Sequence, residues 1–203
     1  MNIVSGCRKL LGARGYGELA AYRYRVFVEH LGWELGCPPE QEADQFDRED
    51  TVYVVSRTDE GDINGCARLL PTSRPYLLQE VFPQLLNGAG PPAADDIWEL
   101  SRFTAVDLAG LQEPGGGRFS SPVAVALLHE SIACAARLGA RRLITVSPLG
   151  VERLLRRAGF RAHRAGPPTM VDGHPLFACW IEVSAPKPKT ETAPVTHIEL
   201  AGQ

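Results

Sequence analysis

Residues 121–160 read SPVAVALLHESIACAARLGARRLITVSPLGVERLLRRAGF, and this stretch decides the fold class. Ser121–Pro122 supplies a helix N-cap followed by proline at the first helical position, so we expect a helix from there to Gly139. The β-branched residues of 141–147 predict a strand. Ser147–Pro148 then repeats the capping pattern before a second helix that ends at Gly159. A helix, a strand and a helix in direct succession are typical of an α/β protein.

The segments on either side extend this alternation. A helix is predicted over 16–31, where apolar residues recur at helical spacing and Gly32 supplies a C-terminal cap. The acidic stretch 34–50 is expected to be a loop or a mobile flap. Strands are predicted over 51–57, 63–71, 97–106 and 175–183, the first two joined by a turn at 59–62. The chain is therefore expected to form an α/β sheet covered by helices.

Length and composition suit one folded domain, since the chain has 203 residues, of which 44% are hydrophobic and 22% charged. We expect this domain to cover residues 1–185, followed by a flexible tail, 186–203. No stretch approaches the roughly 18 apolar residues of a membrane span, and the N-terminus lacks a secretion signal. The five cysteines are scattered and are expected to be reduced thiols, and the histidines lack metal-ligand spacing. A cytoplasmic protein with no membrane span and no metal site is expected.

Charge is distributed unevenly along the chain. Between Glu29 and Asp62 eleven acidic residues accompany two basic ones, whereas between Arg118 and Arg164 nine arginines accompany two glutamates. The acidic part could hold a cationic ligand and the basic part an acidic partner, although either run could also be a solvated surface. No aromatic residues interleave with the arginines, so nucleic acid is not an expected partner.

Charged residues on apolar elements mark the candidate site. In the predicted strand IWELSRF (97–103), alternation places Glu99, Ser101 and Phe103 on one face and Arg102 on the other. Two further arginines, Arg23 on the apolar stripe of the first helix and Arg68 in the hairpin strand, also lie among apolar residues. A buried charge needs a partner, which could be a structural ion pair or a ligand.

Six spaced motifs together resemble the acyl-homoserine-lactone synthases, which make quorum-sensing autoinducers. The resemblance runs from residue 8 to about residue 183, with the motifs in the order of the family. The motifs are Arg23–x3–Phe27, Leu31-Gly32-Trp33, Asp44–x2–Asp47, Arg68-Leu69-Leu70-Pro71-Thr72, Val81-Phe82-Pro83 and Trp98-Glu99-Leu100-Ser101-Arg102-Phe103.

The resemblance implies a single autoinducer synthase domain with a GNAT-like acyltransferase fold, a mixed central sheet flanked by helices. It also implies a reaction in two parts. The amine of S-adenosylmethionine attacks an acyl thioester on acyl carrier protein, and the methionyl carboxylate then closes a homoserine lactone with release of 5'-methylthioadenosine. No cofactor is implied, because S-adenosylmethionine is a substrate and the phosphopantetheine belongs to the acyl donor.

The chemistry of this substrate gives the motif residues roles. Acidic side chains complement its cationic groups, Trp33 offers an aromatic face to a cation, and arginine can bind its carboxylate with two hydrogen bonds. Glu99 is the candidate general base, because an ammonium must lose a proton before it attacks. The predicted catalytic residues are Glu99, Ser101 and Arg102, and the predicted substrate contacts are Arg23, Phe27, Trp33, Asp44, Asp47, Arg68, Phe82 and Phe103. The aromatic residues could instead serve core packing.

An apolar tunnel for the acyl chain is implied in the C-terminal half. Its expected lining is Val123, Leu127, Leu143, Thr145 and Ser147. The hydroxyl of Ser147 matches a family position that influences acceptance of oxidised chains, although Ser147 could equally be a helix N-cap. Arg153 and Arg157 lie four residues apart on one helix and match family positions that dock acyl carrier protein, the alternative being a solvated face.

Two functions of other classes remain open at this stage. One is a GNAT-type N-acyltransferase that uses acyl-CoA, although Arg118-Phe119-Ser120-Ser121-Pro122 lacks the glycines of a pyrophosphate-binding turn. The other is a non-catalytic module that binds acyl carrier protein through arginines. The polar motifs argue against the second, because docking alone needs no polar pocket.

Overall fold

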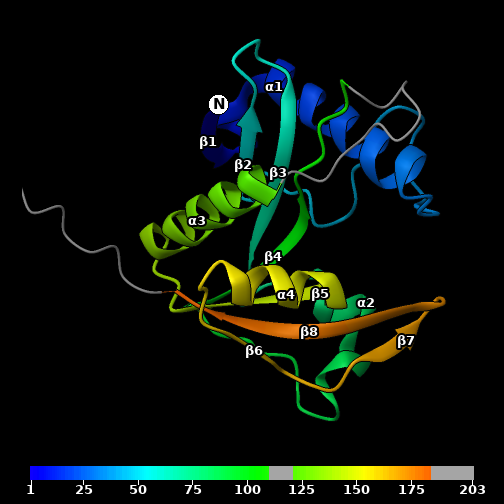
Figure 1. Cartoon of the computed structure of the whole chain (residues 1–203), viewed down its shortest axis with the longest axis vertical. Helices are drawn as coiled ribbons and strands as arrows, with labels where there is room; N and C mark the ends of the chain where they lie inside the picture. Colours follow the sequence, from blue (N-terminus) through cyan, green and yellow to red (C-terminus); the bar gives the residue numbers. More distant parts are fainter. Residues whose placement is uncertain (110–120, 184–203) are drawn as a thin grey trace, which may run out of the picture.

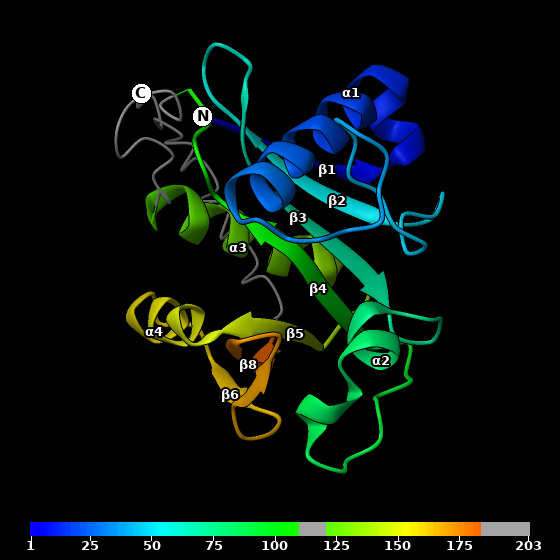
Figure 2. The same ribbon diagram turned by 90° about the vertical axis from the view of Figure 1, so that its right-hand side faces the viewer.

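The computed structural model describes residues 1–109 and 121–183. The predicted tail 186–203 and the expected loop around Gly115–Gly117 lie outside these ranges. A single mixed sheet of eight strands runs in the order β1-β2-β3-β4-β5-β8-β6, with β7 paired to β8. Among its pairs, β4 and β5 are parallel and the others are antiparallel. Figures 1 and 2 show helices on both faces of the sheet, as predicted.

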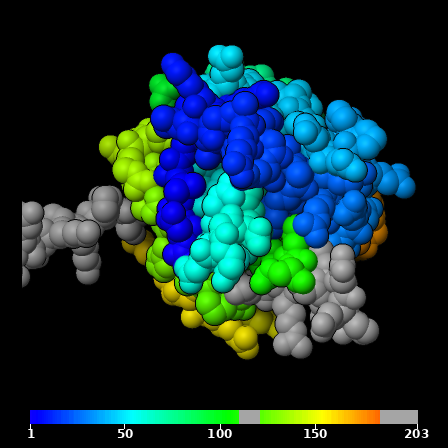
Figure 3. Space-filling model, turned by 90° about the horizontal axis from the view of Figure 1, so that it is seen from above, coloured from blue at the N-terminus to red at the C-terminus, as the bar shows by residue number. Residues whose placement is uncertain are grey.

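The central strands are largely buried, and Gly61 and Gly173, both with positive φ, lie in the turns that join β2 to β3 and β7 to β8. The strands are β1 (Asn2–Cys7), β2 (Val52–Arg57), β3 (Ile63–Pro71), β4 (Ile97–Thr104), β5 (Arg142–Pro148), β6 (Ala162–Arg164), β7 (Thr169–Val171) and β8 (His174–Glu182). The strands predicted over 51–57, 63–71, 97–106, 141–147 and 175–183 are confirmed to within two residues. Sequence analysis missed β1, β6 and β7. Viewed from above, the blue N-terminal segment lies on the surface beside the cyan residues of β2 and β3, because β1 is an edge strand (Figure 3).

The helices are α1 (Arg8–Arg23), α2 (Leu77–Val81), α3 (Ser121–Arg137) and α4 (Leu149–Arg157), with a π-helix η1 (Tyr24–His30) and a 3₁₀ turn η2 (Pro83–Leu86). Gly12, with a φ of 70°, interrupts α1, so the continuous helix begins after Gly12, close to the predicted start at residue 16. It continues as η1 after Arg23. Gly32 ends it with a positive φ of 69°, and its N–H donates to the carbonyl of Val28. The predicted cap is confirmed. In the described residues, no helix is both long enough and apolar enough to cross a membrane.

The two faces of the sheet carry different cores. On the α3 face, which α3 and α4 cover, Val54, Leu69, Leu100, Leu143 and Phe177 pack against Leu127 and Leu155. On the loop face, which α1, η1, residues 31–51 and α2 cover, the apolar residues form two groups, one around Phe27 and Tyr53 and one around Leu78 and Ile144. The candidate site residues are therefore divided between two sides of one sheet.

Candidate active site

Three arginines and three carboxylates form one buried cluster on the loop face, which we call the ion cluster: Arg23, Arg68, Arg102, Glu42, Asp44 and Asp47. Arg23 bonds Glu42 and reaches both oxygens of Asp47, at 2.8 and 3.0 Å. Arg68 binds both oxygens of Asp44, at 2.6 and 3.1 Å, and lies 3.1 Å from Asp47. Arg102 contacts Glu42 at 3.0 Å and Asp44 at 2.9 Å. The six formal charges balance, so each arginine on an apolar element has a partner.

The three carboxylates of the ion cluster lie on the loop of residues 31–51, and backbone hydrogen bonds hold the part of this loop that carries them. The N–H of Glu42 donates to the carbonyl of Ala20 in α1, and the N–H of Asp44 donates to the carboxylate of Asp47 at 2.9 Å. Phe46, between them, is only 1% exposed and packs into the core of the loop face. The prediction of a loop is confirmed, but Glu42 and Asp47 are as buried as core residues.

Burial and pairing act oppositely on the groups of the cluster. Burial alone would raise the pKa of the Asp47 carboxyl, but the guanidinium groups of Arg23 and Arg68 hold that pKa well below its usual range. Burial alone would likewise lower the pKa of Arg23, because it opposes the charged form. Asp47 and Glu42 outweigh this effect and raise the pKa of Arg23 above its ordinary value. Both groups therefore stay ionised, and removing one partner would leave an uncompensated buried charge.

Arg102 reaches the cluster because strand β4 is irregular. Its φ is +51°, and the pairing with β3 shifts by one residue between Cys66 and Arg68. The predicted alternation is therefore wrong beyond Ser101: Arg102 joins Ser101 on the loop face, and Phe103 packs into the core of the α3 face. Arg68 donates to the hydroxyl of Ser101 at 3.0 Å, so the predicted catalytic residues Ser101 and Arg102 both lie at the ion cluster.

Two of the predicted aromatic residues flank the cluster. The rings of Phe27 and Trp33 stack with their centroids 4.8 Å apart, and the guanidinium of Arg102 lies 5.6 and 5.9 Å from them. Trp33 is 41% exposed, so this side of the cluster is open. Phe82 lies elsewhere, at the end of α2, packed against the group around Leu78.

Glu99 is fully buried, and its carboxylate holds the first turn of α2. The N–H groups of Leu77 and Leu78 donate to its two oxygens at 3.0 and 2.6 Å. Burial raises the pKa of Glu99 to about 7, although these N–H groups and Arg68 partly oppose the shift. A carboxyl group that titrates near neutral pH can exchange a proton with a substrate amine.

The sheet divides beside Glu99. Strands β4 and β5 pair only from Ile97↔Arg142 to Glu99↔Ile144, and both strands continue beyond that point. Backbone groups at the fork therefore have no partner in the neighbouring strand. One arm of the fork carries Ser101 and Arg102, and the other carries Thr145 and Ser147.

The predicted acyl-chain residues gather on the α3 face next to this fork. Leu127 and Leu143 are fully buried in its core, and Thr145 and Ser147 are 4% and 5% exposed on the same face of β5. Val123 packs at the start of α3, where its Cγ1 would lie 3.3 Å from a Cβ placed on Gly65. The N-cap alternative for Ser147 is wrong, because the N-cap of α4 is Pro148 and no side chain bonds that helix end.

Helix α4 presents arginines that form no ion pair with the part of the chain that the structure describes. Arg137 and Arg164 pair with Glu130 and Glu152, but no carboxylate of the described ranges pairs with Arg153, Arg156 or Arg157, which are exposed. Arg153 and Arg157 border a hollow of about 390 Å³ between α4 and the start of α3, with Val125, Leu154 and Ala158 in its lining.

Sequence analysis did not assign Glu42 and Tyr53. Glu42 bridges Arg23 and Arg102, and the hydroxyl of Tyr53 donates to Asp47 at 3.0 Å. Charge balance was the available signal for Glu42, because three arginines on apolar elements require a third carboxylate beside Asp44 and Asp47. Tyr53 gave no signal, since aromatic residues are ordinary in strands.

Comparison with known proteins identifies the family. A family model described as autoinducer synthase matches residues 9–190. The chain belongs to the autoinducer synthase family. Acyl-homoserine-lactone synthases of Acinetobacter nosocomialis and Ralstonia solanacearum are 57% and 51% identical to it, over 90% and 82% of this chain and 100% and 81% of theirs. The predicted family, and an enzyme of acyltransferase type, are confirmed.

Solved autoinducer synthases share the fold. TofI, in a ternary complex with an inhibitor and MTA, is 47% identical with a TM-score of 0.78, and the match covers 91% of this chain and 93% of TofI. BjaI, a CoA-dependent synthase solved with SAM and isopentyl-CoA, is 25% identical with a TM-score of 0.76, covering 90% and 82%. An N-acetyltransferase fold from Lactobacillus plantarum is 18% identical with a TM-score of 0.56, covering 90% and 98%. The predicted GNAT-like fold is confirmed.

Proposed function

We propose that this autoinducer synthase acylates the amine of S-adenosylmethionine from an acyl thioester on acyl carrier protein and then closes the homoserine lactone. The observation that carries the proposal is the fork between β4 and β5. It joins an ion cluster on the loop face to an apolar lining on the α3 face. The reaction needs such an arrangement, because a zwitterionic amine must meet the carbonyl of an apolar chain.

The amino-acid part of S-adenosylmethionine fits the open edge of the ion cluster. Asp44 and Arg102 are 16% and 7% exposed, whereas the other four members are exposed by 2% or less. We assign the substrate ammonium to Asp44 and its carboxylate to Arg102, since each is the charge complement of the group it would meet. Phe27 and Trp33 would face the sulfonium, which suits an aromatic surface.

The buried members of the cluster support this edge. Arg23, Arg68, Glu42 and Asp47 already use their polar atoms on one another, so a direct substrate contact would cost existing bonds. They hold Asp44 and Arg102 in a fixed geometry, and they tie helix α1 and strand β3 to the loop of residues 31–51. Preorganised charges of this kind need no rearrangement when the substrate binds.

Glu99 would take the proton that the ammonium must lose. It lies two residues before Ser101 on the same face, about 7 Å along the strand, so transfer through one water suits the spacing. The free amine attacks the thioester carbonyl, the carbon–nitrogen bond forms, the carbon–sulfur bond breaks and the thiolate leaves with a proton. The carboxylate oxygen then attacks Cγ, and the bond from Cγ to the sulfonium sulfur breaks as methylthioadenosine leaves.

The donor would enter from the α3 face. The hollow between α3 and α4 has apolar walls and an arginine border, which suits a phosphopantetheine arm and the acidic protein that carries it. Unpaired backbone groups at the fork would hold the arm and the thioester carbonyl. Some family members are CoA-dependent, as the names of BjaI and MesI state. The exposed arginines of α4 favour a protein carrier here. Several positive charges spread over a surface can contact an acidic protein at several points, whereas a small donor reaches fewer of them.

The test is product formation with matched donors. The purified protein is incubated with S-adenosylmethionine and the same hexanoyl group on acyl carrier protein, on CoA or on pantetheine, and products are identified by mass spectrometry. A lactone formed fastest from the protein-linked donor supports the proposal. A lactone formed fastest from CoA replaces the carrier assignment, and an acylated amine without lactone overturns the second step.

A further inference from the structure

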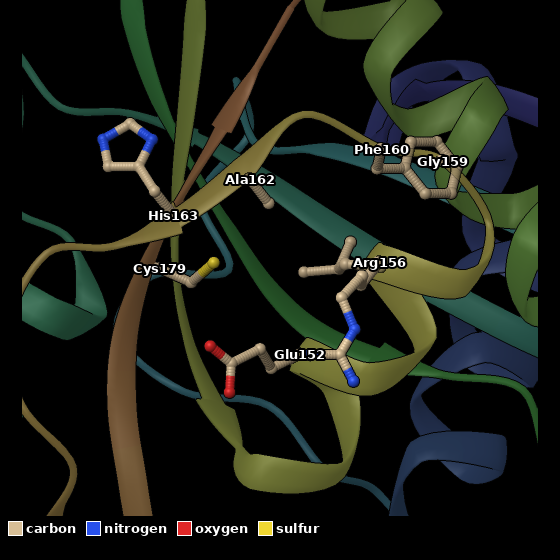
Figure 4. Close-up of a pocket in the computed structure, with 8 residues that line it drawn as sticks. Glu152, Arg156, Gly159, Phe160, Ala162, His163 and Cys179 are labelled. Carbon is tan, nitrogen blue, oxygen red and sulfur yellow. The ribbon is translucent and has the colours of Figure 1, made fainter.

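The two edges of the sheet are built differently. At one edge, β8 pairs with the three-residue strands β6 and β7, which Gly-Pro-Pro (166–168) separates. Proline has no backbone N–H to offer, and a Cβ on Gly166 would clash with the carbonyl oxygen of Leu85, so the chain at η2 lies directly against this break. In Figure 4 the side chain of Ala162 in β6 is directed into the space beside α4, whereas the ring of His163 turns away from it. A short, interrupted and partly covered edge of this kind discourages the addition of another strand.

The opposite edge is the regular strand β1. All six of its residues pair with β2, from Asn2↔Arg57 to Cys7↔Val52, and no strand of residues 1–109 and 121–183 pairs with its outer side. Its sequence, NIVSGC, contains neither proline nor a charged residue. Figure 3 shows this blue segment at the surface of the molecule. Half of its backbone N–H and C=O groups point away from β2, and such a row is a template for another strand.

Apolar side chains are exposed at this edge. Ile3 packs into the core of the α3 face and Ser5 accepts a hydrogen bond from α3 at 3.2 Å, so alternation places Val4 and Gly6 on the loop face. A Cβ on Gly6 would lie 3.0 Å from that of Leu10, so Leu10 lies over the strand on that face. Val4 and Leu10 are 41% and 77% exposed. Both lie beside the unpaired edge, where a second strand would cover them.

Charges at the two ends of β1 are opposite. The turn of residues 59–62, beside its N-terminal end, carries three exposed carboxylates, of which the amino group of Met1 compensates one. They are Asp59, Glu60 and Asp62. Arg8 and Lys9, both exposed, follow its C-terminal end. A second copy related by a two-fold axis perpendicular to the sheet runs antiparallel to the first, so the acidic end of one strand lies beside the basic end of the other. This edge is therefore complementary to itself in charge.

We propose that β1 is a dimerisation edge, on which a second copy of this chain pairs antiparallel, with Val4 opposite Val4, and continues the sheet across the two-fold axis. This register keeps each face continuous, because residues of the same face meet. It also brings the turn that holds Glu60 in one copy near Lys9 of the other. A six-residue edge makes a small interface, so we expect a reversible dimer with a dissociation constant of about 1–100 µM. The dimer does not depend on the proposed function.

The first experiment is sedimentation equilibrium of the unaltered protein and two variants between about 1 and 200 µM. The mean mass of the unaltered protein should rise toward twice that of the chain. Val4→Lys places like charges opposite each other across the axis and should raise the dissociation constant at least tenfold. Met170→Lys is the matched control, because Met170 is an apolar residue, 64% exposed, at the other edge of the sheet. This variant should dimerise as the unaltered protein does.

A charge exchange tests the antiparallel arrangement. Lys9→Glu and Glu60→Lys each place like charges together at both ends of a homodimer, so each variant should dimerise several-fold more weakly. When the two variants are mixed, each altered charge meets its opposite in the heterodimer. Native mass spectrometry, with a tag on one variant, should therefore show the heterodimer in excess over both homodimers. A statistical mixture of the three dimers overturns the antiparallel arrangement.

Hydrogen exchange tests the edge without any substitution. The amides of residues 2–7 in the unaltered protein should exchange more slowly at about 200 µM than at about 1 µM. A protein that stays monomeric over this range, with no such slowing, overturns the proposal. So does a dimer that a folded Val4→Lys variant leaves intact. Lactone formation is not a readout of either experiment, so a failure of the proposed function is recognised separately, by the absence of product.

Discussion

Glu99 combines two roles in one side chain, since it holds the start of α2 and titrates near neutral pH. Glu99→Gln keeps a hydrogen-bond acceptor for α2 but cannot accept a proton. We expect kcat/KM to fall by about 10²-fold or more, as for a lost general base. The rate of the unaltered protein should rise with pH through about 7, and this rise should be absent from the variant.

The same substitution makes a prediction about stability. The folded-state pKa of Glu99 is raised from 4.5 to about 7, so folding favours its protonated form. This contribution is complete below pH 4.5 and is lost as pH rises through about 7. Glu99→Gln should therefore flatten the dependence of Tm on pH across this interval. An unchanged slope would contradict the raised pKa, whatever the activity.

The buried and the open parts of the ion cluster should respond differently to mutation. Asp47→Asn leaves Arg23 and Arg68 partly unpaired in the core, and we expect a loss of about 3–5 kcal/mol in the free energy of unfolding. Asp44→Asn affects the more exposed edge, so it should raise the KM for S-adenosylmethionine with a smaller loss of stability. Denaturant unfolding and initial rates, measured on both variants, check the contrast. Equal stability losses would place Asp44 with the buried support.

At this scale the sequence predicted which residues carry charge into the core, but not how they pair. Arg23, Arg68 and Arg102 were found because each interrupts an apolar pattern. The face of Arg102 could not be predicted, since its left-handed backbone has no signal in strand alternation. Glu42 was one acid among many in an acidic loop, and only the fold selects it.

Among the elements, helix α4 carries the docking prediction. Arg153→Glu with Arg157→Glu reverses two exposed charges that have no described partner, so the fold should tolerate the change. The KM for a carrier-linked donor should rise several-fold, and the rate of the unaltered protein should fall as salt increases. The KM for S-adenosylmethionine should barely move. A matched acyl-pantetheine donor is the control, and equal harm to both donors would contradict docking.

Strand β5 carries the prediction of acyl selectivity. The hydroxyl of Ser147 lies 3.5 Å from that of Thr145 and caps no helix. Ser147→Ala should shift the ratio of oxidised to unsubstituted acyl products, with little loss of stability. The size of the shift should correspond to the free energy of one hydrogen bond, about 1 kcal/mol. Product ratios from mixed donors measure the shift. A constant ratio would assign the hydroxyl to packing alone.

Elements with strong periodicity or capping could be predicted, including β3, β5, α3 and α4. The short strands β6 and β7 could not, because three residues carry no period and both depend on pairing with β8. The π-helix after Arg23 could not be predicted either, because over two turns its apolar spacing resembles that of an ordinary α-helix.

For the whole molecule, the ion cluster predicts sensitivity to acid. The pKa of Asp47 is lowered in the folded state from 3.8, so its stabilising contribution is complete above that value and is lost as pH falls below it. Thermal unfolding between pH 5 and 2 should show this loss. In Asp47→Asn the acid-dependent loss should be smaller, and a loss as steep as in the unaltered protein would assign it to other carboxylates.

The narrow junction of β4 and β5 has a consequence for how such enzymes can diversify. Within residues 1–109 and 121–183, three residue pairs between β4 and β5 join the two halves of the sheet. The side chains assigned to S-adenosylmethionine all precede Ala105, whereas those assigned to the acyl donor all follow Ser121. A recombination event between these two points would exchange the donor half as a unit. Hybrid synthases built this way should inherit the acyl signal of the parent that supplies their C-terminal half.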